Sequence, residues 1–111
     1  MTLRTTGRRT GGAVETAVGY VEEPDGRVLI AAGEPDADWA LNLFANPRCH
    51  VTLATASWDA VAEPVEGADA AAAVTALILR YGTPAEGLGR GPVFRLRPVS
   101  VSLSREIAGD A

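Results

Sequence analysis

Apolar and polar residues alternate along the first third of the chain, and the alternation predicts a hairpin. After a short extended segment at residues 3–6, one face of residues 13–21 carries the alternate positions Val14, Thr16, Val18 and Tyr20. Residues 24–26 read Pro-Asp-Gly, which is turn chemistry, and a continuous apolar run follows at 28–32. The pattern therefore predicts that a single strand at 14–21 pairs antiparallel with 27–32. The apolar run is expected in the centre of a sheet.

A short helix is predicted at residues 39–46. Asp36 and Asp38 lie at its start, where acidic residues cap free N–H groups and suit the positive end of the helix dipole. Asn46 tolerates a left-handed C-terminal conformation and Pro47 cannot continue a helix, so this pair marks the end. The helix therefore joins an acidic loop to the next strand.

Two side chains of this helix are candidates for a pocket wall. Trp39 and Leu43 lie one turn apart on one face, with Asn42 beside them. Tryptophan often anchors a core, and an asparagine here can bond a neighbouring loop. The pattern fits packing and pocket lining equally, so both interpretations of Trp39 and Asn42 stay open at this point.

The second half of the chain predicts three further strands. They are expected at 48–55, at 58–65 after a junction at Ala56-Ser57, and from Phe94 onward. The apolar phase of the last strand slips at Pro98, which cannot donate to a ladder, so a bulge or an edge is expected there. Cys49 shares a face with apolar neighbours and is expected to be a small buried hydrophobe.

An Ala-rich helix is predicted between the last two strands. It begins near Asp69 as cap and ends at Gly82, and its core-facing stripe is Val74, Leu77, Ile78 and Tyr81. The tally is about six strands and two helices, with short hairpin links. The expected fold is therefore mainly β (α+β), a six-stranded antiparallel split β-barrel with two short flanking helices.

Composition narrows the class of protein. The chain has 111 residues, which predicts one domain, with a core at 3–104 and a flexible tail at 105–111. A formal net charge of −4 argues against nucleic-acid binding. No apolar run approaches the roughly 18 residues of a membrane span, so we expect a cytoplasmic protein. His50 is the only histidine and has no partner at ligand spacing, so no metal site is predicted.

Three motifs in order carry a family resemblance. They are Thr5-Thr-Gly-Arg-Arg-Thr-Gly11, Gly19-Tyr20-Val21 and Trp39-x-x-Asn42-Leu43-x-Ala45-Asn46-Pro47. Together they resemble the deazaflavin-dependent nitroreductase family, split β-barrel oxidoreductases that use coenzyme F420. The resemblance implies transfer of a hydride from reduced F420 to a nitro compound, a quinone or a similar small electrophile. It also implies a possible homodimer, for which the last strand, with Val99, Val101 and Leu103, is the candidate contact.

The resemblance also implies where the cofactor would bind. The phosphate would contact the loop residues Arg8, Arg9 and Thr10, and arginine forks with a hydroxyl suit phosphate oxygens. Ala32 and Gly33 would lie near the deazaflavin ring, and the same pocket would be lined by Trp39 and Asn42. The cofactor supplies the chemistry, so no catalytic protein residue is predicted.

Two alternatives follow from departures from the family pattern. The loop 33–38 is short and acidic, and basic residues are missing after Gly11. One alternative is a degenerate barrel that serves as a binding or dimer module without catalysis. The other is an FMN-dependent reductase, because FMN has a single phosphate and lacks a glutamate tail.

Overall fold

Every strand of the described residues joins one antiparallel sheet. The structure is a computed structural model, which describes residues 1–82 and 90–99. Its elements are β1 (Thr2–Thr6), β2 (Ala13–Ala17), β3 (Val21–Glu22), β4 (Val28–Ala31), α1 (Asp38–Ala45), β5 (Arg48–Leu53), β6 (Ala56–Val65), α2 (Gly67–Tyr81) and β7 (Val93–Pro98). The strand order is β2-β1-β5-β6-β7-β4-β3. The predicted class, mainly β with two flanking helices, is confirmed.

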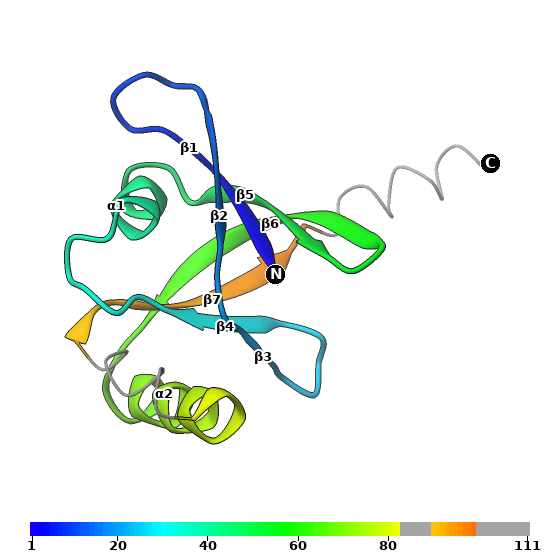
Figure 1. Cartoon of the computed structure of the whole chain (residues 1–111), viewed down its shortest axis with the longest axis vertical. Helices are drawn as coiled ribbons and strands as arrows, with labels where there is room; N and C mark the ends of the chain where they lie inside the picture. Colours follow the sequence, from blue (N-terminus) through cyan, green and yellow to red (C-terminus); the bar gives the residue numbers. More distant parts are fainter. Residues whose placement is uncertain (83–89, 100–111) are drawn as a thin grey trace.

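Only three residues join the two edges of the sheet. β2 and β3 stand at opposite ends of the strand order, yet residues 18–20 alone separate them in sequence. The sheet therefore curls until its edges approach, and Figure 1 shows the resulting half-barrel. The single strand predicted at 14–21 is instead two strands, which raises the count from six to seven. Period-2 alternation continues through residues 18–20 while the pairing partner changes, so the sequence pattern does not record the break.

Tyr81, the last residue of α2, fastens this helix to the seam at residues 18–20. The Tyr20 N–H donates to the Tyr81 hydroxyl at 3.1 Å, and that hydroxyl donates to the Tyr20 carbonyl at 3.2 Å. A Cβ on Gly19 would stand 3.2 Å from the Tyr81 ring, so the ring lies directly against the glycine. At the seam, the Tyr81 hydroxyl thus takes the place of a paired strand as the hydrogen-bond partner of the backbone.

Two helices cover opposite faces of the curled sheet (Figure 1). Inside the barrel, Ile30, Val51 and Phe94 pack with Ala40 and Leu43 of α1. A second core on the outer face joins α2 to β4 and β7 through Leu29, Val93, Ala73 and Leu77. β4 is second from an edge rather than central as predicted, and its continuous apolar run reflects burial on both faces.

The helices begin and end differently from the prediction. α1 starts at Asp38, and its N-cap is Ala37 with no side-chain cap bond. Asn46 is extended (φ −147°, ψ 108°) rather than left-handed. α2 starts at Gly67, which places Asp69 in the first turn, where its charge still suits the helix dipole. Among residues 1–82 and 90–99, no helix is long and apolar enough to cross a membrane.

The β5–β6 hairpin turns two residues earlier than predicted. Ala54 takes a left-handed conformation (φ 55°) at the turn, and Ala56 already pairs with Leu53. Alanine gives no sequence signal for a positive φ, which explains why the turn was predicted at Ala56-Ser57 instead. The predicted phase of these strands is confirmed, because Cys49 and Val51 are buried.

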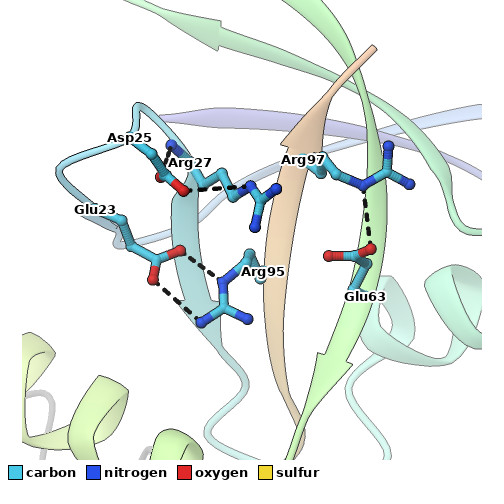
Figure 2. Close-up of polar contacts among 6 residues, drawn as sticks. All are labelled: Glu23, Asp25, Arg27, Glu63, Arg95 and Arg97. Carbon is cyan, nitrogen blue, oxygen red and sulfur yellow. Dashed lines mark hydrogen bonds and ion pairs between the residues drawn. The ribbon is translucent and has the colours of Figure 1, made fainter. Parts of the chain in front are cut away.

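One ion pair joins the β3–β4 hairpin to β7, and another joins β6 to β7 (Figure 2). Arg95 donates to the two carboxylate oxygens of Glu23 at 2.6 and 3.1 Å. Arg97 donates to Glu63 at 3.1 Å on the neighbouring strand. Glu23 and Arg95 are about one-quarter exposed and form a fork, so they fix how the hairpin lies on β7.

The predicted dimer contact and tail fall mostly outside the described residues. Val99 is the last residue before this limit, and its N–H donates to the Asp59 carbonyl at 3.0 Å. Val101, Leu103 and the tail 105–111 lie beyond it. The domain limits at 3 and 104 therefore stay a prediction.

Candidate functional site

The loop between β1 and β2 is a compact turn. The Gly7 N–H donates to the Gly12 carbonyl at 2.7 Å, and the Gly11 N–H donates to the Gly7 carbonyl at 2.8 Å. Gly11 has φ +76°, a conformation that favours glycine. The Thr10 hydroxyl oxygen accepts the Gly12 N–H at 3.3 Å. The loop therefore has a defined shape set by its own backbone.

Asn42 ties this loop to α1. It is only 3% exposed, and its Oδ1 accepts the backbone N–H of Arg8 at 3.1 Å. Its Nδ2 donates to the Thr5 hydroxyl on β1 at 3.2 Å. A buried amide must find such partners or lose stability, so Asn42 fixes the helix, the strand and the loop relative to one another.

Arg8 lies back against the same helix. Its Nη1 donates to Asn42 Oδ1 at 2.9 Å and to the Asp38 carbonyl at 3.4 Å, and its Nη2 donates to Asp38 Oδ1 at 3.2 Å. The Arg8 side chain is 23% exposed, whereas that of Asp38 is 84% exposed. Most of the N–H groups of the Arg8 guanidinium therefore bond α1 and hold the loop against this helix.

Arg9 and Thr10 keep their donors available. Both are exposed, and among the described residues no acceptor bonds the Arg9 guanidinium or the backbone N–H groups of Arg9 and Thr10. Successive free N–H groups in a turn form a concave surface that suits an anion. An arginine beside them adds charge and a fork of donors.

These residues surround a hollow of about 210 Å³, which we call the loop hollow. It is lined by Gly7, Arg8, Arg9, Thr10, Val14, Asp38 and Asn42. Four of the seven predicted cofactor residues, Arg8, Arg9, Thr10 and Asn42, meet here. Asn42 lies thirty-four residues from Arg8 in sequence, and only the fold brings them together.

The other three predicted residues, Ala32, Gly33 and Trp39, do not line the loop hollow. Ala32 is 1% exposed, and its N–H donates to the Pro92 carbonyl at 2.9 Å. Trp39 is half-buried and lies against Phe94, with ring centroids 6.0 Å apart. Their contact with a cofactor stays a prediction.

Sequence reasoning missed Asp38 and Val14 as lining residues of the loop hollow. Asp38 was expected as a helix cap, and its bond to Arg8 spans thirty residues that no local pattern connects. His50 also has a partner that spacing did not reveal, because its Nδ1 lies 2.8 Å from Asp59 Oδ1 on the paired strand. Within the described part of the chain, no group of three His, Cys, Asp or Glu side chains is arranged to hold a metal ion.

The curled antiparallel sheet with its two helices defines a split-barrel protein, and the loop hollow gives it a place suited to an anion. Comparisons with known proteins narrow this class. The family model described as F420H(2)-dependent quinone reductase matches residues 1–85. The chain belongs to this family. A search among curated protein sequences finds no match.

Solved structures at 25–26% sequence identity share this fold. One described as an F420-H2 dependent reductase (FDR-A) superposes with a TM-score of 0.74 at 26% identity, covering 86% of this chain and 91% of that chain. Another, described as a domain-swapped dimer, has a TM-score of 0.73 at 26% identity, with 86% and 78% covered. HutZ, a heme storage protein from Vibrio cholerae, has a TM-score of 0.66 at 25% identity, with 88% and 81% covered.

These matches confirm the resemblance to F420-dependent split-barrel reductases. They indicate dependence on F420H2 as the cofactor. They give no support to the FMN alternative.

Proposed function

We propose that the protein binds reduced F420 and reduces a quinone or a similar small electrophile, such as a nitro compound. The observation that carries the proposal is the loop hollow, which Arg9 and Thr10 line with a guanidinium and two backbone N–H groups that have no acceptor among the described residues. When bound, F420H2 supplies a hydride, which together with one proton converts a quinone to a hydroquinone. The protein itself then binds and orients the cofactor and the substrate and shields them from water.

The donors of the loop hollow fit a phosphate group. Arg9 offers a fork of N–H donors, and the backbone N–H groups of Arg9 and Thr10 offer two more. Arg8 adds positive charge from the side, partly balanced by Asp38, while its main part is to hold the loop. Asn42 supports both through its bonds to Arg8 and Thr5. Thus Arg9 and Thr10 are the contacts, and Arg8 and Asn42 are the positioning residues.

The remaining predicted residues are proposed to border the deazaflavin ring. Trp39 precedes Asn42 by one turn of α1, so a ligand held in the loop hollow beside Asn42 can extend along the same helix toward the indole. Its indole is half-buried against Phe94, which gives it a fixed orientation. Ala32 and Gly33 lie at the end of β4, in the loop that leads to this helix.

The first experiment is a fluorescence titration of the purified protein with F420, and with FMN in parallel. Saturable F420 binding that weakens as salt rises is expected, because a phosphate held by arginine is screened. Turnover of F420H2 with quinone and nitro substrates then identifies the electrophile. Absence of F420 binding would overturn the proposal and favour a barrel that serves as a binding or dimer module.

A homodimer is the proposed assembly. A solved structure similar to this chain is described as a domain-swapped dimer. Light scattering coupled to gel filtration is expected to give twice the mass of the chain. A single-chain mass at all accessible concentrations contradicts this part of the proposal.

A further inference from the structure

A second hollow lies on the outer face of the barrel. Its volume is about 370 Å³, and it is bounded by β1, β5, β6 and the far side of the loop 7–12. The side chains of Arg4, Arg48, His50 and Asp59 line it, with Gly11 and Ala13 at the loop. We call it the outer hollow. None of its lining residues belongs to the loop hollow.

The polar side chains here form one row across four strands. Glu15 pairs with Arg4, Arg4 with His50, and His50 with Asp59, each directly opposite in the sheet register. Arg4 donates to Glu15 at 2.9 Å, and His50 lies 2.8 Å from Asp59. The acidic residues at both ends of the row thereby hold the two basic side chains in place between them.

Arg48 adds a charge without a partner among the described residues. It is exposed on β5, two residues from His50, and it forms no ion pair within residues 1–82 and 90–99. Two guanidinium groups and one carboxylate, that of Asp59, lie in the lining, and Arg4 is already paired with Glu15 on β2. Arg48 is therefore the cation of the outer hollow that remains available to a ligand anion.

We propose that the outer hollow binds a carboxylate group of an organic acid. Arg48 presents a fork of N–H donors that suits an oxygen pair, and Arg4 on the neighbouring strand adds its Nη1, which does not bond Glu15. When the ring proton of His50 is on Nδ1, facing Asp59, Nε2 is left to accept an N–H from the ligand. The second oxygen of Asp59 accepts an N–H next to the carboxylate, so an acid with an amide or amino group fits best.

Two sources have this chemistry. Gly11 of the outer hollow directly follows Thr10 of the loop hollow, so one molecule can reach both across the glycine turn. F420 carries a glutamate tail beyond its phosphate, and the first source is this tail, which rests on the proposed function. The second source is a separate organic acid of the glutamate type, which does not depend on F420.

The direct test is a titration with the dipeptide γ-glutamyl-glutamate, followed by NMR. His50 is the single histidine, so in a protein without a histidine tag its ring signals need no assignment. Saturable shifts of these signals are expected. Arg48→Gln is expected to raise the dissociation constant about three- to tenfold, in line with one exposed charge-assisted contact. Arg27→Gln, whose side chain pairs with Asp25 on the β3–β4 hairpin, is the matched control and is expected to bind as the unaltered chain does.

A second arm separates the sources. F420 with its glutamate tail and a form without glutamate are compared on the unaltered chain and on Arg48→Gln. A tail-dependent gain in affinity that Arg48→Gln removes identifies the cofactor tail. Dipeptide binding without tail dependence identifies a separate acid.

Each failure has a distinct meaning. If neither the dipeptide nor the tail has an effect, or if Arg48→Gln changes neither, the outer hollow is not a carboxylate site. Binding of tail-free F420 in that case leaves the proposed function intact. Loss of binding for both forms of F420, with dipeptide binding kept, overturns the proposed function and keeps this one.

Discussion

Asn42 on α1 accepts two hydrogen bonds from Arg8, one from the backbone N–H at 3.1 Å and one from the guanidinium at 2.9 Å. The same side chain reaches Thr5 on β1 through its Nδ2. A helix, a strand and a loop therefore share one buried amide. This arrangement makes the loop rigid before any ligand arrives, which lowers the entropic cost of binding.

Replacing Asn42 is expected to loosen the loop. Asn42→Leu has a similar size but leaves the Arg8 N–H and the Thr5 hydroxyl without their partner, at a cost of about 1–3 kcal/mol in the free energy of unfolding. F420 affinity is expected to fall together with stability, as measured by urea unfolding and fluorescence titration. Asn42→Asp is the control, because its oxygens still accept from Arg8 and from the Thr5 hydroxyl. Unchanged F420 affinity in Asn42→Leu would show that the loop does not need this support.

Arg8 and Arg9 are expected to differ although they are neighbours of the same type. Arg9→Gln should weaken F420 binding about three- to thirtyfold with little effect on stability, because its side chain is exposed and contacts only the ligand. Arg8→Gln should lower both affinity and the unfolding temperature, because Arg8 bonds Asn42 and Asp38. Titration and thermal unfolding of the two variants separate these roles. Equal losses of stability in both would contradict the division.

The candidate residues of this loop were predicted through the family resemblance of the motif at residues 5–11, but their geometry was not. The partners of Arg8, however, lie thirty and thirty-four residues along the chain, and no local pattern links such positions. The His50–Asp59 pair could not be predicted for the same reason, because it depends on the register of β5 and β6.

The fold class followed from hairpin spacing, whereas the closure of the barrel did not. Alternation at 13–21 continues through the seam at 18–20, so the pattern alone gives one strand where the structure has two. The partner that occupies the seam is Tyr81, sixty-one residues away from Tyr20. It was expected on a core-facing stripe, and it is 40% exposed because its hydroxyl and ring serve the seam instead.

Substitution of Tyr81 therefore tests whether its hydroxyl stabilises the closed edge of the barrel at residues 18–20. Tyr81→Phe keeps the ring on Gly19 but removes the bonds to the Tyr20 N–H and carbonyl. We expect a loss of about 1–2 kcal/mol in the free energy of unfolding. Hydrogen exchange at the Tyr20 amide should accelerate as well. Leu79→Ala is the control on the same helix, because Leu79 is 82% exposed. An unchanged exchange rate at Tyr20 in Tyr81→Phe would mean that the hydroxyl does not close the seam.

Cys49 is expected to make stability fall at high pH. Burial, with a smaller effect of the nearby Asp59 charge, raises the pKa of its thiol to about 11. Below pH 9 the thiol is protonated in both the folded and the unfolded chain, so it adds no pH dependence. Between pH 9 and 11 the unfolded thiol ionises while the folded one stays protonated. The unfolded state is thereby favoured, by about 2 kcal/mol near pH 10.5.

Cys49→Ala isolates this effect, because it removes the titrating group and leaves the rest of the core in place. Urea unfolding of both chains at pH 8 and pH 10.5 gives the comparison. The alanine variant is expected to be less stable at pH 8, since it loses the packing of the sulfur and the Sγ contact of 3.6 Å to the Ala60 carbonyl. The difference in the free energy of unfolding between the two chains should narrow at pH 10.5, because only the chain with Cys49 is destabilised by ionisation of the thiol in the unfolded state. A constant gap would mean that the thiol ionises equally in both states, and that strand β5 admits water at this position.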